Sequence, residues 1–422
     1  MKPRELDSRT LIDEIVRENY GKVLSLLISR LNHFELAEDA LQEAIIAAIE
    51  TWSDDLIPDN PVAWLVSVAS RKAIDRIRRQ TLFDKKSAQI SHYESSIREP
   101  ELFEDQIDDM TIPDERLRLI FTCCHPALAE PARIALTLKT LCGLTTEQIA
   151  HAFLIPEPTL AQRLLRARHK IISAGIHFEI PDQAIITDRL KSVLNCIYLI
   201  FNEGYASSSG KDSIDQALSS EALRLSGMLI QLMPGNTECL GLHCLMLFHH
   251  SRFTARLDQD GEPIDLQNQD RSLWNIDQIK TADKLLKATL MKGDIGSYQI
   301  QAAISAIHSH SVDFGATDWP QIVMLYKKLL TFDDNPIIKL NMAVALSYAK
   351  DPSIALRLID QLTTIKTMQS YYPYYVARAS CLERLQRFDE ARCCYQLAIE
   401  HCSNGAQKRY LEKKYTSIGS KH

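Results

Sequence analysis

One segment, residues 143–171, constrains the fold of this chain more than any other. Its sequence, GLTTEQIAHAFLIPEPTLAQRLLRARHKI, contains two helix-like stretches that Pro156 separates. Thr145 and Gln148 have the spacing of a capping box, which predicts that a short helix begins there. Pro158 predicts the start of a second helix, because proline is favoured in the first helical turn. The segment therefore predicts two short helices joined by a tight turn.

The second of these helices has two unlike faces. Apolar residues recur at helical spacing and predict a buried stripe: Leu160, Leu164, Ala167 and Ile171. The opposite face is polar and basic: Thr159, Gln162, Arg163, Arg166 and Lys170. An apolar back and a basic front are typical of a recognition helix that enters the major groove of DNA. A helical hairpin with a solvated basic face is the alternative that this segment alone leaves open.

Charge is distributed unevenly along the chain. The net charge is −6 over 422 residues, but residues 84–116 hold ten acidic and four basic residues, a surplus that accounts for all of it. Residues 71–79 carry five bases and one acid, and residues 163–170 carry four bases and no acid. Because the local field decides whether phosphates are attracted, both basic segments are candidate nucleic-acid surfaces.

The composition also argues against several classes of protein. Hydrophobic residues make up 45% of the chain and follow helix-period patterns, which predicts an all-α fold. No apolar run approaches the roughly 20 residues of a membrane span, and the charged start lacks the apolar core of a signal peptide, so we expect a cytoplasmic protein. The ten cysteines lack zinc-finger spacing, and the cluster at Cys123, Cys124 and His125 has no second ligand pair. We therefore expect no metal and no cofactor.

Changes in pattern divide the chain into four parts. We expect a helical domain over residues 6–83, an acidic flexible linker over 84–112, a helical module over 113–175 and a helical extension over 182–422. Asn60 and Pro61 predict the start of the basic helix in the first domain. Near the end of the extension, Ala343 and Ala345 recur as Ala377 and Ala379. The spacing of 34 residues predicts a tetratricopeptide-like fold there.

Three stretches in this order resemble the extracytoplasmic-function (ECF) family of bacterial RNA polymerase sigma factors. AEDALQEAIIAAIETW is similar to the region-two helix that contacts the clamp of the polymerase's largest subunit. NPVAWLVSVASRKAIDRIRRQ resembles the following helix, which binds the melted −10 element of the promoter. Residues 143–171 resemble the region-four helix-turn-helix that reads the −35 element. The acidic linker between them also fits the family.

The resemblance implies roles for individual residues. It places polymerase contacts at Asp39, Gln42 and Glu43. It places DNA contacts at Arg71, Lys72, Arg76, Arg78, Arg79, Thr159, Gln162, Arg163, Arg166 and Lys170. Arg168 is expected to contact a phosphate or to clamp its own domain, Asp75 to pair with Arg71 or Arg79 within the helix, and Trp64 to lie in the core. In the linker, the family role is to mimic nucleic acid near the polymerase active site, and a solubilising tether is the alternative: Glu94, Glu99, Glu101, Glu104, Asp105, Asp108 and Asp109.

The extension resembles that of an ECF subgroup with a long helical C-terminal region. The residues that carry this resemblance are YLIFNEGYASSSG, QDRSLWN and the tetratricopeptide-like tail. In that subgroup the extension is thought to replace a separate anti-sigma factor. Two polar constellations stand out in it: one of Asn202, Glu203, Gly204 and Tyr205, and one of Asp258, Asp260, Glu262, Asp265 and Asp270. A possible ligand or peptide site comprises Asn202, Glu203, Tyr205, Asp270 and Arg271, and loop caps with interhelix hydrogen bonds are the alternative.

These observations lead to one expected function and one alternative. We expect a sigma factor that binds the clamp and flap of core RNA polymerase and directs initiation at specific promoters. Its extension would act as an intramolecular regulator or bind a peptide or protein partner. The alternative is a stand-alone helix-turn-helix regulator with a ligand- or peptide-sensing helical domain. An enzyme is not expected, because the chain has no nucleophile–base pair, P-loop or HExxH motif.

Overall fold

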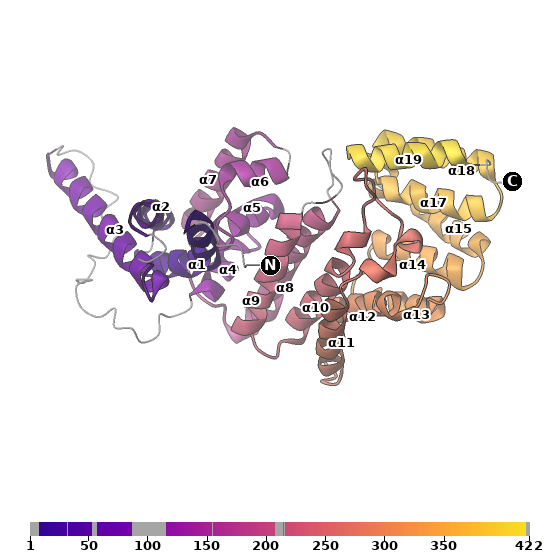
Figure 1. Ribbon diagram of the computed structural model, residues 1–422, viewed down its shortest axis with the longest axis horizontal. Helices are drawn as coiled ribbons and strands as arrows, with labels where there is room; N and C mark the ends of the chain where they lie inside the picture. Colours follow the sequence, from indigo (N-terminus) through magenta and orange to yellow (C-terminus); the bar gives the residue numbers. More distant parts are fainter. Residues whose placement is uncertain are drawn as a thin grey trace, which may run out of the picture. The chain divides into compact units, whose positions relative to one another are not determined.

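The computed structural model (Figure 1) describes residues 8–31, 33–52, 57–86, 115–153, 155–206, 214 and 216–418. Regular structure in these residues is helical, and the only strand-like pairing among them is an isolated bridge between Leu257 and Pro263. The all-α prediction is therefore confirmed. The chain divides into two compact units, Met1–Cys196 and Ile197–His422. None of the described helices is long and apolar enough to cross a membrane.

Unit 1 contains seven complete helices in its described residues and the first part of an eighth. They are α1 (Ser8–Leu31), α2 (Phe34–Thr51), α3 (Pro61–Lys86), α4 (Arg116–Cys123), α5 (Glu130–Leu141), α6 (Thr146–Ala152), α7 (Glu157–Ser173) and α8 (Gln183–Tyr205). Helices α1, α2 and α3 pack against one another, and α1 also packs against α4 and α5. The two modules expected from the sequence therefore form one compact body.

Small residues let α2 approach its neighbours closely. Its buried face consists of Ala37, Ala40, Leu41, Ala44 and Ala48. The larger Ile45 beside them is only half-buried, so alanine rather than isoleucine fills the closest contacts of this face. Trp52 is buried at the end of the helix and meets the half-buried Trp64 edge to face, with 5.1 Å between the ring centres.

Helix α3 begins where the sequence predicts. Asn60 Oδ1 accepts a hydrogen bond from the backbone N–H of Ala63 at 3.0 Å, and Pro61 is the first helical residue. The helix runs to Lys86, so the first three residues of the expected linker, 84–86, are helical. The rest of the expected linker, including its seven acidic candidates, lies outside the described residues.

The helix-turn-helix of the sequence prediction is present as α6 and α7. Thr145 Oγ1 accepts from the N–H of Gln148 at 3.0 Å, while Gln148 Oε1 accepts from the N–H of Thr145 at 2.8 Å. This is the reciprocal capping box. The buried residues of α7 are the four predicted ones: Leu160, Leu164, Ala167 and Ile171.

Gly143, in the loop before α6, is required by two independent constraints. Its φ angle is +70°, a conformation that side chains disfavour. A Cβ atom at this position would also lie 2.9 Å from Cγ of Tyr20 in α1. The loop can therefore approach α1 only with glycine at position 143.

Helix α8 contributes to both units. Its first part holds the end of α4, where helix carbonyls lack partners within the helix. Arg189 Nη2 donates to Phe121 O at 2.9 Å, and Ser192 Oγ donates to Cys124 O at 2.6 Å. Arg133 of α5 donates to Ser192 Oγ. These contacts explain why the division between units falls after Cys196, inside α8, and not in the segment before residue 182.

Unit 2 continues as a succession of helices. They are α9 (Gln216–Leu232), α10 (Thr237–His250), α11 (Ile276–Leu290), α12 (Ser297–His310), α13 (Trp319–Leu329), α14 (Pro336–Ala349), α15 (Pro352–Gln361), α16 (Lys366–Gln369), α17 (Tyr372–Arg384), α18 (Phe388–His401) and α19 (Gly405–Ser417). Its described residues also include four short 3₁₀ turns: η1 (Phe253–Ala255), η2 (Leu266–Asn268), η3 (Arg271–Leu273) and η4 (Leu362–Thr364).

The final helices stack in pairs, as the 34-residue spacing predicts. Helix α14 packs on α15, and α17 packs on α18, while α14 and α15 both contact α17 (Figure 1). Ala343, Ala345 and Ala379 are fully buried, and Ala377 is partly buried. Small side chains at these repeated positions let successive helices approach one another.

Candidate nucleic-acid interface

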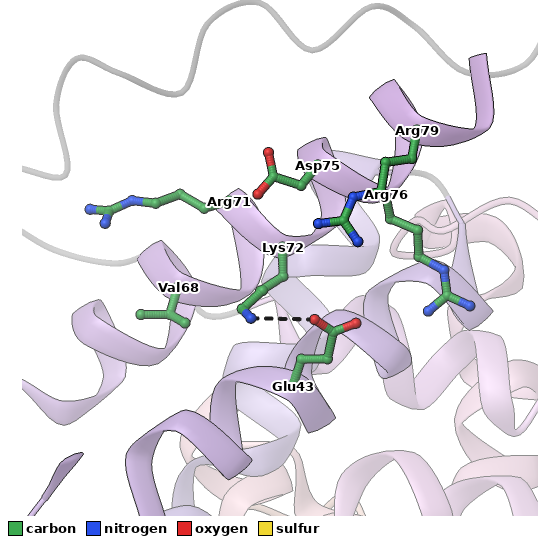
Figure 2. A pocket seen from close by; sticks show the side chains of 7 residues that line it. All are labelled: Glu43, Val68, Arg71, Lys72, Asp75, Arg76 and Arg79. Atoms are coloured by element: carbon green, nitrogen blue, oxygen red, sulfur yellow. Dashed lines mark ion pairs between the residues drawn. The ribbon is translucent and has the colours of Figure 1, made fainter. Parts of the chain in front are cut away.

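The basic residues of α3 lie at a surface pocket of about 590 Å³ (Figure 2). Its lining residues are Glu43, Val68, Arg71, Lys72, Asp75, Arg76 and Arg79. The basic side chains among them are exposed, as is that of Arg78. All five predicted basic contacts of this helix are therefore accessible from solvent.

Acids of α2 pair with bases of α3 at this pocket. Glu43 Oε2 lies 3.6 Å from Lys72 Nζ (Figure 2). Asp39 Oδ2, which is not part of the pocket lining, lies 2.7 Å from Arg76 Nη1. All four side chains are about half exposed, so each pair stabilises the fold by at most about 1 kcal/mol. The structure thus joins two of the predicted polymerase contacts to two of the predicted DNA contacts. Such weak pairs can be exchanged for contacts with a partner.

The expected role of Asp75 is wrong. It makes no ion pair with Arg71 or Arg79 in the described residues, and Arg71 Nη2 donates instead to Ser67 Oγ at 3.1 Å. Exposed pairs of this spacing gain little over solvation, so helical spacing alone does not enforce them. No carboxylate in the described part of the chain lies within 4 Å of Arg71, Arg78 or Arg79.

The polar face of α7 is open to solvent. Thr159, Gln162, Arg166 and Lys170 are exposed, and Arg163 is half-buried. None of these five side chains has a hydrogen bond or ion pair with another described residue. Three cations on one face of a helix, without acids beside them, form a surface suited to phosphates and base edges.

Arg168, on the flank of α7, has a structural contact instead. It forms an ion pair with Glu38 of α2, and Lys139 Nζ of α5 lies 3.6 Å from the same carboxylate. The side chains of Glu38, Lys139 and Arg168 are only 13–17% exposed. Arg168 therefore has a clamping role, but it joins α7 to α2 of the other module and does not clamp its own domain as expected. The sequence did not single out Glu38 or Lys139, because their pairing joins distant parts of the chain.

Tyr20 is a second contact between the two modules. Its side chain is buried between α1 and the loop at Gly143, and burial, with Glu38 nearby, raises the pKa of its hydroxyl well above the ordinary value. Gln42, a predicted polymerase contact, donates to Tyr20 Oη at 3.4 Å. The packing of Tyr20 against the loop at Gly143 therefore joins the α1–α3 and α4–α7 modules, while its hydrogen bond with Gln42 lies within the α1–α3 module.

The cysteines of α4 belong to the core. Cys123 and Cys124 are fully buried, with their sulfurs 3.2 and 3.4 Å from the hydroxyls of Thr140 and Thr137. Across the described residues there is no group of three or more His, Cys, Asp or Glu side chains arranged to hold a metal ion.

Comparison with protein families and relatives assigns these modules. Residues 15–83 match the sigma-70 region 2 family, residues 118–171 match the sigma-70 region 4 family, and residues 189–290 match a family of unknown function (DUF6596). An uncharacterized protein of Rhizobium meliloti (strain 1021) is 36% identical over 399 residues, which cover 94% of each chain. The ECF RNA polymerase sigma factor SigK of Mycobacterium ulcerans (strain Agy99) is 27% identical over 145 residues, 34% of this chain and 74% of that one.

The chain belongs to the extracytoplasmic-function sigma factors that carry a long C-terminal extension. Sigma region 2 comprises α1–α3, and region 4 comprises α4–α7. These domains imply that the sigma factor binds core RNA polymerase and promoter DNA. Sigma factor families are not enzymes. No solved structure matches the chain.

In the extension of this sigma factor, the acidic run forms structural contacts. Asp258 Oδ1 accepts from two backbone N–H groups of its own turn at 2.9 Å. Glu262 pairs with Lys413 of α19 at 2.6 Å, and Asp265 pairs with Lys414 at 3.0 Å. Asp270 caps η3, because its Oδ1 accepts from the N–H of Ser272 at 2.9 Å. The alternative of loop caps and interhelix contacts accounts for these acids.

The other residues of the candidate extension site each contact different neighbours. Asn202 and Glu203 are both half-buried on α8, with Asn202 near the buried Tyr198. Tyr205 stacks on Phe201, and Arg271 lies over the ring of Trp274. Three neighbours that the sequence did not single out, His249, Arg252 and Arg256, lie around Tyr205 and Trp274.

Proposed function

We propose that this sigma factor grips promoter DNA at two surfaces, the basic face of α3 and the polar face of α7. The observation that carries the proposal is the accessibility of both faces. Eight cations on these two faces are at least partly exposed, and most have no acidic partner among the described residues. In this assignment α3 follows the phosphates of the −10 element, and α7 reads the −35 element.

Asp39, Gln42 and Glu43 are proposed to contact the clamp of the polymerase. They lie on the exposed face of α2, and their contacts within the chain are weak. A basic partner surface can therefore replace those contacts at a small cost in free energy. The polymerase flap is proposed as the second contact, on region 4.

The extension is proposed to regulate the sigma domains within the same chain. Support comes from α8, whose first part hydrogen-bonds to the end of α4 through Arg189 and Ser192. The extension thus begins on region 4, the domain assigned to the −35 element. The stand-alone regulator that the sequence left open assigns no role to the region-two helices α2 and α3.

Run-off transcription tests the proposal. DNA that the chain binds together with core polymerase would be sequenced to define a promoter, and that promoter would be transcribed with purified core enzyme and the full chain. We expect a specific transcript that requires the chain. A stand-alone regulator would give no transcript without another sigma factor, and that result would refute the assignment.

A further inference from the structure

Three arginines of the extension lie around the segment that follows α10. The guanidinium carbons of Arg252 and Arg271 lie 5.8 and 4.5 Å from the ring centre of Trp274. That of Arg256 lies 3.4 Å from the ring centre of Tyr205. No carboxylate in the described part of the chain is within 4 Å of any of the three. Each guanidinium therefore lies within cation–π distance of an aromatic ring and has no acidic partner.

Partial burial of these three positive charges is unfavourable when no anion is bound nearby. Arg252 is only 7% exposed. Burial lowers the pKa of both Arg256 and Arg271, and the nearby charge of Arg252 lowers both further. Asp313 acts on Arg271 in the opposite direction but forms no ion pair with it. Arg256 and Arg271 are only partly buried, but the buried Arg252 acts on both, so a compensating negative charge would stabilise the cluster.

Two of the arginines donate hydrogen bonds to carbonyls at helix ends, but these bonds use only some of their N–H groups. Arg256 Nη1 donates to the carbonyl of Tyr205, the last residue of α8. Arg271 Nη1 donates to the carbonyls of His308 and Ser311 at 2.6 and 2.7 Å, at the end of α12. Cations at a helix C-terminus are favourable there. Among the described residues, no carbonyl at a helix end accepts from the side chain of Arg252 or from Arg271 Nη2.

Four adjacent residues carry buried polar atoms without a partner among the described residues. The atoms are Arg252 Nε, Arg271 Nη2, Trp274 Nε1 and His308 Nδ1. The first three can only donate hydrogen bonds. Burial, reinforced by Arg252 and Arg271, lowers the pKa of His308 to about 4, so its ring is neutral at pH 7. Buried polar atoms are rarely left unpaired, so four in one neighbourhood leave hydrogen-bonding capacity that a ligand can use.

His249 contacts the cluster as a neutral group. Its Nδ1 lies 3.1 Å from Arg252 Nη2 and accepts a hydrogen bond from it, and its Nε2 lies 3.2 Å from Ser305 Oγ. Burial lowers the pKa of this imidazole well below its ordinary value. His249 is therefore a neutral group that orients Arg252.

We propose that Arg252, Arg271, Trp274 and His308 form a binding site for the oxyanion group of a small-molecule ligand, a carboxylate or a phosphate. The planar fork of a guanidinium matches both groups, and an indole N–H adds a donor. Bound oxyanion would neutralise the cluster and satisfy its unpaired donors. Oxyanion binding at this site does not depend on whether the extension regulates transcription.

Calorimetric titration of the full chain tests this proposal. The probes are sodium phosphate and sodium acetate, each compared with sodium chloride at the same ionic strength. We expect saturable binding of one or both oxyanions and none of chloride. Binding of phosphate alone would assign a phosphorylated ligand, and binding of acetate alone would assign a carboxylate. Absence of saturable binding by both probes overturns the proposal.

Substitutions locate the site. Arg252→Lys and Arg271→Lys keep the charge but remove the planar fork, so each is expected to weaken binding by about tenfold or more. Arg357→Lys, at an exposed position of α15, is the matched control and is expected to bind as the parent chain does. Unchanged affinity in both cluster variants would place the binding elsewhere and reject the site.

A spectroscopic measurement follows binding in the unsubstituted chain. The chain has four tryptophans, so the indole N–H signals are few. We expect the Trp274 indole resonance, assigned by Trp274→Phe, to shift with phosphate or acetate and to saturate. A resonance that responds to neither probe contradicts the proposal. Neither outcome bears on run-off transcription, so the oxyanion site and the sigma-factor assignment can fail separately.

Discussion

Arg168 in the recognition helix α7 forms an ion pair with Glu38 of α2, which lies 130 residues earlier in the chain. Lys139 of α5 shares the same carboxylate. Region 2 and region 4 are thus joined at a largely buried site by one acid and two bases. Removal of the acid leaves both cations poorly solvated, whereas removal of an exposed acid leaves its partner in water.

The first prediction concerns the effect of Glu38→Gln on stability. We expect it to lower the free energy of unfolding of the unit by about 1–3 kcal/mol, because Lys139 and Arg168 are left without the carboxylate that they share. Urea unfolding measured by circular dichroism would check this. Glu43→Gln, which breaks the half-exposed pair with Lys72, is the control, with an expected loss below about 0.5 kcal/mol. Equal losses in the two variants would contradict the special role of Glu38.

The second prediction concerns sequence reading by α7. Arg163→Ala and Arg166→Ala should each weaken binding to a cognate −35 element by about 1–3 kcal/mol, since each removes a donor to a base edge or phosphate. Binding of core polymerase should not change. Lys191→Ala on the exposed face of α8 is the control cation. Retention of full promoter affinity by both arginine variants would remove α7 from the proposed interface.

The third prediction concerns the binding of DNA phosphates by α3. Replacing Arg71, Arg78 or Arg79 by alanine should weaken binding to all promoter sequences about equally. Each of these substitutions should also reduce the slope of log affinity against log salt by about 1, because one cation fewer neutralises a phosphate. Titration of labelled promoter DNA with the polymerase complex at several salt concentrations measures both quantities. A sequence-dependent loss of affinity with an unchanged slope would instead indicate that these arginines bind base edges.

The fourth prediction is a dependence of stability on pH. Burial lowers the pKa of His243 to about 4, and its Nδ1 is paired with Ser226 Oγ at 2.7 Å. The unfolded chain has the ordinary value near 6.5, so between these pH values it binds more protons than the folded chain. Stability should therefore fall as pH is lowered from 6.5 towards 4, with a slope from this residue of up to about 1.4 kcal/mol per pH unit.

His243→Gln should flatten that slope, and urea unfolding at pH 6.5, 5.5 and 4.5 would measure it. His177→Gln is the control, because His177 is exposed. If both variants keep the parent slope, the buried imidazole is not its source.

The fifth prediction tests the extension without truncating it. The double substitution Arg189→Gln and Ser192→Ala removes the side-chain hydrogen bonds to the end of α4. Under the proposed function, transcription from a cognate promoter should change at least about twofold, while core polymerase binding stays the same. The exposed pair Lys191 and Asp188 supplies control substitutions on the same helix. Unchanged transcription would separate this contact from regulation.

Local chemistry explains what the sequence could predict. The capping box of Thr145 and Gln148, the Asn60 cap and the buried stripe of α7 all depend on residues within one helical turn or one helix face. Such spacings are visible in any single sequence. The region-two and region-four assignments rested on three local motifs of this kind.

Contacts between distant segments of the chain could not be predicted from the sequence. Glu38 resembles any other acid on an exposed helix until α5 and α7 bring Lys139 and Arg168 to it. Arg252 and Arg271 likewise become neighbours only through the fold around Trp274. For Asp75 the sequence predicted a contact that does not form. Its helical spacing allows an ion pair with Arg71 or Arg79, but the structure has none.

The ion pairs between α2 and α3 have a thermodynamic consequence. Asp39 and Glu43 hold Arg76 and Lys72 in the free chain. In the proposed function, polymerase takes up the two carboxylates and promoter phosphates take up the two cations. Each ligand thereby removes a competitor of the other, and linkage requires the benefit to be mutual. Polymerase and promoter would then bind this chain cooperatively, so that neither is held firmly alone.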